Sequence, residues 1–228
     1  MDKKHFLMIS GITLIALALA ILLPGGRPVQ DNPRLPWLIE IDPHGQTRVF
    51  GLTLGTSTLQ QARQELQQPG EVSLFSTPEG HFMVEAYFQR LHLSGIRADM
   101  VLTLDLDQSR LAEMYDRGLR ISQLESGAKK VKLAETDMAS VAQAAIRHIT
   151  YLPAADLDED LIRRRFGEPM QRISEPSGVV HWIYPQKGLD IALNPDGKEI
   201  FQYISPAHVG ELLKPLENLE RSQPSAAN

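Results

Sequence analysis

Apolar residues recur at spacings of three and four in three stretches of this chain, and that period predicts amphipathic helices. The first stretch is TLQQARQELQQP (58–69), which Thr58 opens with the pattern of a capping box. The second is DMASVAQAAIRHITYL (137–152), and the third is LDEDLIRRRFGEP (157–169). In the third stretch acidic residues come first and three arginines come last, which suits the dipole of a helix.

Other stretches alternate apolar and polar residues, which predicts strands. A hairpin is expected over residues 37–50, where DPHG supplies the turn. The run 100–115 is expected to turn back on itself around Asp107 and form a second hairpin. Further strands are expected over residues 72–76, 81–88, 119–134, 179–185 and 188–204.

The helix and strand patterns occur twice in the same order, which indicates an internal repeat. With Thr58 placed over Asp158, the helix positions coincide without a gap. The matched pairs are Ala62 with Ile162, Leu66 with Phe166, Pro69 with Pro169, Met100, Leu102 and Leu104 with Leu189, Ile191 and Leu193, Asp107 with Asp196, Leu111 with Ile200, and Met114 with Tyr203. The predicted fold class is α+β, with an N-terminal transmembrane helix followed by two tandem helix-plus-antiparallel-sheet units. The second face of each sheet is expected to meet water, the sister unit or a partner.

The beginning of the chain predicts a membrane anchor. Residues 6–23 read FLMISGITLIALALAILL, an uncharged run at the lower length limit for crossing a bilayer, so contact with the membrane is expected there. No small-x-small cleavage site follows, so an uncleaved signal anchor is favoured over a cleaved signal peptide. Lys3 and Lys4 favour a cytoplasmic N-terminus. The predicted location is the bacterial inner membrane, with a single span and a periplasmic C-terminal domain.

These boundaries divide the chain into five expected parts. The parts are an anchor (1–23), a linker rich in proline and glycine (24–36), a first α+β repeat (37–135), a second α+β repeat (136–215) and a flexible polar tail (216–228). The sequence has no cysteine, which excludes disulfides, thiol catalysis and a lipid-modified cysteine. Its net charge of −5 gives no reason to expect a nucleic acid partner.

The helix-ending and strand motifs resemble a known family. The stretches that carry the resemblance are TLQQARQELQQP (58–69) with VLTLDLDQSRL (101–111), and LIRRRFGEP (161–169) with HWIYP (181–185) and LDIALNPDGKEI (189–200). They are similar to the SmpA/OmlA (BamE-like) family, and the tandem pair resembles the architecture of the β-lactamase-inhibitor protein. The first copy has Gln67 where the second has Gly167, and the lipobox cysteine is missing. The resemblance implies a non-enzymatic role in partner binding or assembly in the cell envelope.

Sequence motifs for catalysis, metals and cofactors are absent. The seven histidines are scattered, and no P-loop, G-x-S-x-G or G-x-G-x-x-G pattern occurs. DLDQSR (105–110) has an arginine where a calcium loop needs glycine, so a hairpin turn is favoured there. KKVK (129–132) is interpreted as a strand edge guarded by lysines in preference to a lipid-binding patch. We therefore predict no catalytic residue, no metal and no cofactor, and we expect that the protein is not an enzyme.

Aromatic and basic side chains are the candidates for binding a partner. Trp182 and Tyr184 share one strand face and Tyr203 lies on the neighbouring run, where core packing is favoured over an interface. Arg163 and Arg164 belong to three adjacent arginines that fan around a helix, so at least one is expected to be free. The predicted function is a membrane-anchored periplasmic adaptor that binds another cell-envelope protein through its sheet surfaces, with no small-molecule substrate. The alternative is an inhibitor or regulator of an envelope hydrolase.

Overall fold

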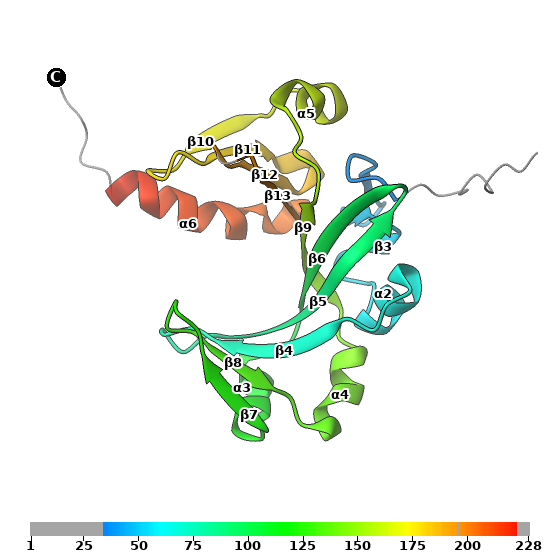
Figure 1. Cartoon of the computed structure of the whole chain (residues 1–228), viewed down its shortest axis with the longest axis vertical. Coiled ribbons are helices and arrows are strands. Elements are labelled where there is room, and N and C mark those ends of the chain that lie inside the picture. The colour runs from blue at the N-terminus through cyan, green and yellow to red at the C-terminus, as the bar shows by residue number, and fades with distance from the viewer. Residues whose placement is uncertain (1–33, 196, 223–228) are drawn as a thin grey trace, which may run out of the picture. The chain divides into compact units, whose positions relative to one another are not determined.

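The computed structural model describes residues 34–195 and 197–222, which belong to one compact unit, Pro33–Asn228 (Figure 1). The helices are α2 (Leu59–Leu66), α3 (Gln108–Asp116), α4 (Glu135–Ala142), α5 (Glu159–Phe166) and α6 (Val209–Ser222), with two 3-10 turns, η1 (Pro185–Lys187) and η2 (Pro206–His208). The strands are β1 (Glu40–Ile41), β2 (Thr47–Val49), β3 (Leu52–Thr53), β4 (Glu71–Ser76), β5 (Phe82–Leu93), β6 (Ile96–Leu104), β7 (Arg120–Gln123), β8 (Lys129–Lys132), β9 (Ile146–Pro153), β10 (Gln171–Ser174), β11 (Val180–Tyr184), β12 (Leu189–Leu193) and β13 (Glu199–Ile204).

Ten strands form one continuous antiparallel sheet in the order β10-β11-β12-β13-β9-β6-β5-β4-β8-β7. β9 pairs with β6 on one side and with β13 on the other, so it joins the strands of the two halves of the chain. β1, β2 and β3 make a separate three-stranded sheet. Thr47 ties this small sheet to the end of β13, because its hydroxyl donates a hydrogen bond to the Ile204 carbonyl at 2.8 Å.

The predicted fold class is wrong, because the chain does not form two tandem units. The described part is mostly antiparallel sheet. The boundary predicted after residue 135 falls inside one compact unit, in which strands from both sides of that boundary belong to the same ten-stranded sheet. The first part of the predicted repeat nevertheless has the same order of elements in both copies. In the first copy α2 is followed by the strands β4 to β6, and in the second α5 is followed by the strands β10 to β12. Thr58 caps α2 and Asp158 caps α5, each through a side-chain oxygen that accepts a backbone N–H.

The predicted correspondence fails after β6. Residues 100–115 were expected to form a hairpin, but the chain leaves the sheet after Leu104 and forms α3, with Asp107 at its N-cap position. The reason is local: Leu111 and Met114 are three residues apart, and as a helix both reach the core. Asp196, which the repeat places over Asp107, lies outside the described residues.

The helix predicted over 137–152 is right only at its beginning. α4 ends at Ala142, and Ile146 to Pro153 form the central strand β9. Ile149 and Tyr151 are buried at alternate positions of that strand, where β-branched and aromatic side chains pack well. The hydrogen bonds that β9 makes to two neighbouring strands outweigh a helical apolar period that is equally visible in the sequence.

Several shorter predictions are confirmed. The hairpin over 37–50 is β1 paired with β2, and Asp42 accepts backbone N–H groups across its turn. The strands over 72–76 and 81–88 lie in β4 and β5, and the pair over 119–134 is β7 with β8. β8 is not an edge, because it pairs with both β4 and β7.

The predicted membrane anchor and inner-membrane location are corrected by the structure. Within residues 34–195 and 197–222, no helix is long and apolar enough to cross a membrane. The predicted span, residues 6–23, lies outside the described residues.

Helices cover the two faces of the large sheet unequally. Buried side chains of α2, α3, α4 and α5 belong to one continuous core with the sheet and β1 to β3. α6 packs separately, through a smaller cluster in which Val209 and Leu216 meet Ile173, Ile183 and Ile204 of β10, β11 and β13. In Figure 1, α6 (red) runs along the β10–β13 end of the sheet, and α3 and α4 lie beyond β4 and β8.

Candidate partner-binding surface

The three aromatic residues predicted as interface anchors lie in the core. Trp182, Tyr184 and Tyr203 are 1%, 4% and 0% exposed. The Tyr203 hydroxyl donates to the Pro36 carbonyl at 2.9 Å and that of Tyr184 to the Gly167 carbonyl at 3.0 Å. Burial raises the pKa of Tyr184 to about 12 and also raises that of Tyr203 well above its ordinary value. These side chains stabilise the fold and are not available to a partner.

The arginines of α5 differ in their contacts. Arg163 forms ion pairs with acidic residues of α5 and, at 2.8 Å, with Glu168, and its guanidinium lies 5.4 Å from the Trp182 ring. Arg165 stacks on the Trp37 ring at 4.6 Å. Arg164 is exposed and has no ion pair within the part of the chain that the structure describes. One free arginine on a helix does not define a binding site.

A larger uncovered surface lies on the sheet itself. Directly paired residues point to the same face, and Thr103 pairs with Glu85 on one side and with His148 on the other. His148 pairs in turn with Ile204, which packs against α6. This is therefore the α6 face of the sheet, yet among the described elements no helix covers it from β9 to β4 (Figure 1).

We call this surface the open face. It consists of Ser73, Phe75, Met83, Glu85, Tyr87, Asp99, Val101, Thr103, His148, Thr150 and Leu152. All of them are partly exposed except Ser73, which is buried. Apolar, aromatic and polar side chains are interleaved on this surface.

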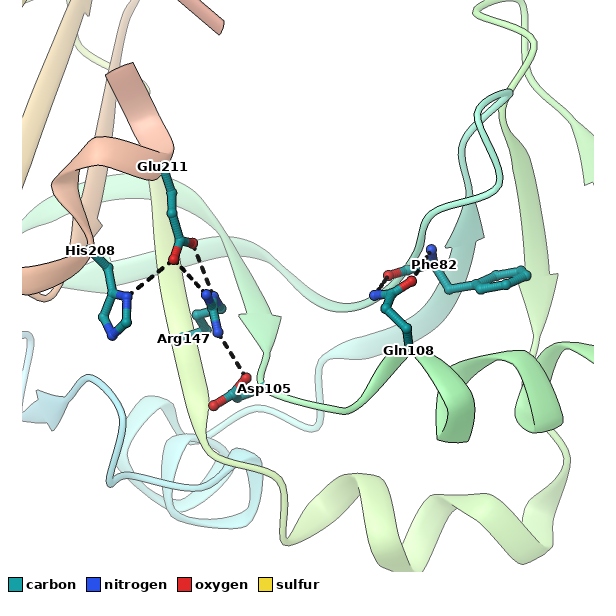
Figure 2. Close-up of polar contacts among 6 residues, drawn as sticks. All are labelled: Phe82, Asp105, Gln108, Arg147, His208 and Glu211. Atoms are coloured by element: carbon teal, nitrogen blue, oxygen red, sulfur yellow. Dashed lines mark hydrogen bonds and ion pairs between the residues drawn. The ribbon is translucent and has the colours of Figure 1, made fainter. Parts of the chain in front are cut away.

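Arg147 marks the boundary between the open face and α6 (Figure 2). Its guanidinium forms an ion pair at 2.6 Å with Glu211 in the first turn of α6 and another at 3.1 Å with Asp105 after β6. Burial acts to raise the pKa of Glu211, but Arg147 and then His208, 3.1 Å away, outweigh it, so the pKa is lowered. Glu211 is therefore charged at neutral pH and holds the start of α6 on β9.

A hollow of about 450 Å³ lies beside this ion-pair network. Phe82, Met83, Thr103, Asp105, Gln108 and Arg147 are among the residues that line it. Gln108 closes one side, because its side chain accepts from the Phe82 N–H at 2.9 Å and donates to the Phe82 carbonyl at 2.8 Å (Figure 2). The hollow thus extends the open face, with two anionic groups, Asp105 and Asp107, and one cationic group, Arg147, on its wall.

Two carboxylates of the open face have different environments. Burial raises the pKa of Glu85, and Glu85 has no ion pair among the residues that the structure describes. Burial also acts to raise the pKa of Asp99, but hydrogen bonds from the Arg90 N–H and the Tyr87 hydroxyl, both 2.7 Å, outweigh it and the pKa is lowered. Glu85 is thus the carboxylate that would gain most from a cation on a partner.

Sequence reasoning missed a buried polar cluster on the side that α6 covers. The Nδ1 atom of His181 lies 2.8 Å from a carboxylate oxygen of Asp190, and its Nε2 atom lies 3.1 Å from one of Glu175. The Ser177 hydroxyl donates a hydrogen bond to Glu175. Burial lowers the pKa of His181, but the two carboxylates outweigh it and the pKa is raised. Both ring nitrogens are engaged and the residue is 6% exposed, so the cluster is a buried polar network that joins β11 to β12 and to the turn before β11. A polar residue in each of the apolar runs VHWIY and LDIAL was the available signal.

Within the described ranges, no group of three or more His, Cys, Asp or Glu side chains is placed to hold a metal ion. Comparison with protein-family models, with curated proteins and with solved structures gives no match. The resemblance to the SmpA/OmlA family therefore stays a prediction.

Proposed function

We propose that this protein is a non-catalytic binding protein that docks another protein on the open face. The observation that supports the proposal is the unequal covering of one sheet face: α6 seals it over β10 to β13 and leaves it uncovered over β4 to β9. A sheet face left without a helix meets either water or a partner. Phe75, Met83, Val101 and Leu152 are partly exposed on this face, and a docked partner would remove their apolar surface from water.

The chemistry of the open face fits a protein partner better than a small molecule. Its apolar side chains are spread over four strands instead of converging on one enclosed pocket. The polar groups among them, including Glu85 and Thr103, supply hydrogen-bond and ion-pair partners at intervals along the surface. A partner would place apolar side chains between these groups and a cation against Glu85.

The proposal is tested by affinity purification of tagged protein from the cells that make it. Thr103→Arg puts a long cation at the centre of the open face, and Gln64→Arg puts the same side chain on the exposed side of α2 as a matched control. We expect one protein to co-purify with wild type and Gln64→Arg and to fall by at least about tenfold with Thr103→Arg, since the long side chain obstructs the surface and lies opposite Glu85, where it takes the place of the partner's cation. Equal co-purification with both variants contradicts the proposal.

A further inference from the structure

The open face continues sideways onto β8 and β7, and β7 is an edge strand. Among the described residues β7 pairs only with β8, and all four of its side chains are exposed. Three large apolar side chains lie in or next to it: Leu119, Ile121 and Leu124 are 64%, 52% and 40% exposed. An exposed edge with apolar side chains is a template for another strand.

The backbone groups on the free side of β7 can be assigned from its ladder. The Leu124 N–H donates to the Ala128 carbonyl at 2.8 Å, and bonding alternates along an antiparallel pair. Ser122 therefore bonds to β8, whereas Ile121 and Gln123 direct N–H and C=O away from it. These are the groups that an added strand would pair with.

The side chains next to this edge are basic. Arg120 lies directly opposite Lys132, and both line a cavity of about 350 Å³ together with Lys130, Glu71 and Ser73. Lys130 is paired with Glu71 at 2.8 Å. Arg120 and Lys132 have no carboxylate partner within the described residues. Like charges placed opposite each other destabilise a strand pair, so an anion bound between Arg120 and Lys132 would stabilise this arrangement.

We propose that β7 binds an extended acidic segment of the partner protein, which adds to the sheet as an eleventh strand. The segment's backbone pairs with Ile121 and Gln123, and one of its carboxylates lies between Arg120 and Lys132. This inference rests on the proposed function for the existence of a protein partner, and it names the partner's chemistry. The rest of the partner would follow the same face from β8 onto β4 and β5.

The opposite edge of the sheet lacks these features. In β10, the guanidinium of Arg172 lies 4.6 Å from the Trp182 ring and pairs with Glu168 at 3.2 Å. Ile173 is buried under α6, which leaves Met170, next to the strand, as the exposed large apolar side chain there. The cation of β10 is thus already engaged, while those beside β7 are not.

The test uses a fluorescein-labelled peptide of five Glu-Val repeats, titrated with the full chain by fluorescence anisotropy. A peptide of five Lys-Val repeats is its matched control. We expect the acidic peptide to bind and the basic one to bind at least about tenfold more weakly. Reversing both free cations, in the double variant Arg120→Glu and Lys132→Glu, is expected to weaken the acidic peptide by about tenfold. Arg164→Glu, on α5, is expected to leave its dissociation constant unchanged.

A second variant tests the edge itself. Ile121→Pro removes an N–H that points away from β8, so the β7–β8 ladder stays intact while an added strand loses a donor. We expect it to weaken the acidic peptide by about tenfold, whereas Ile121→Thr, which keeps the N–H, changes binding by less than about threefold. Circular dichroism establishes that both variants fold. Unchanged binding by Ile121→Pro, or equal binding of both peptides, overturns the inference.

Two other outcomes separate this inference from neighbouring explanations. Sedimentation of the chain alone tests self-pairing, and a dimer that Ile121→Pro abolishes would assign the edge to a second copy and overturn the acidic partner. If Thr103→Arg abolishes co-purification of the partner but Ile121→Pro does not, the proposed function stands and the β7 inference falls. If the acidic peptide binds as expected while Thr103→Arg has no effect on co-purification, the open-face proposal falls instead.

Discussion

The two ends of the ten-stranded sheet are built differently. Over β10 to β13 both faces are covered, with Trp182 and Tyr203 under one layer and Ile183 and Ile204 under α6 on the other. Over β4 to β9 only the helix face is covered, and it carries Leu74, Val84 and Met100 into the core. We refer to these regions as the closed half and the open half.

The difference separates residues that hold the fold from residues that are free to do something else. In the closed half most side chains of β11, β12 and β13 are buried against other protein, so their identity is fixed by packing. In the open half alternate side chains of β5 and β6 are partly exposed and are not fixed by packing, yet they are not uniformly polar. The stability of the molecule and its proposed binding therefore depend on different parts of the same sheet.

The largest expected effect comes from removing a side chain of the closed half. Trp182→Ala is expected to lower the free energy of unfolding by about 3–5 kcal/mol, because it empties a fully buried site. Val101→Ala on the open face is expected to cost less than about 1 kcal/mol. Urea denaturation followed by circular dichroism measures both, and comparable losses would show that the two halves do not differ as described.

Two histidines on the same sheet face should respond to pH in opposite directions. Burial lowers the pKa of His148, at the edge of the open half, from 6.5 to about 4. Because the unfolded chain takes up that proton first, this contribution to stability is present above pH 6.5 and is lost as the pH falls, by up to about 3 kcal/mol near pH 4. His181, whose pKa is raised, contributes stability that is present below pH 6.5 and is lost as the pH rises through its folded pKa.

NMR titration of the two imidazoles checks these directions, and the variants His148→Gln and His181→Gln assign the signals. Each variant should also remove its own part of the pH dependence of unfolding. An imidazole of His148 that titrates near 6.5 would mean that the boundary between the two halves is open to water.

Local features of the fold could be predicted from the sequence. The caps at Thr58 and Asp158, the buried Ile162 and Phe166, and the hairpin around Asp42 follow from side-chain chemistry within a few residues. The placement of β9 could not, because Ile149 belongs equally to a helical and to an alternating pattern. Which pattern wins is decided by β6 and β13, strands more than forty residues away in the sequence.

The candidate surface was harder to predict than the fold. Trp182, Tyr184 and Tyr203 are of the residue types that often anchor interfaces. Residue type alone does not predict which face of a strand a helix will cover. The open face is defined by where α6 begins, and the ion pair between Arg147 and Glu211 holds that beginning on β9. The β7 edge had a visible signal in the alternation of Leu119 and Ile121 with Arg120 and Ser122, which predicts a strand but does not indicate whether another strand lies beside it.

The account's central claim is that a protein docks on the open half of the sheet. The most direct test places the photo-crosslinking residue p-benzoylphenylalanine at Thr103 in the open half and, as a control, at exposed Arg164 over the closed half. Irradiation of cells that make each variant should give a discrete adduct from Thr103 and none from Arg164, because short-lived radicals react only with groups in contact. An adduct from Arg164 with none from Thr103 would contradict the claim.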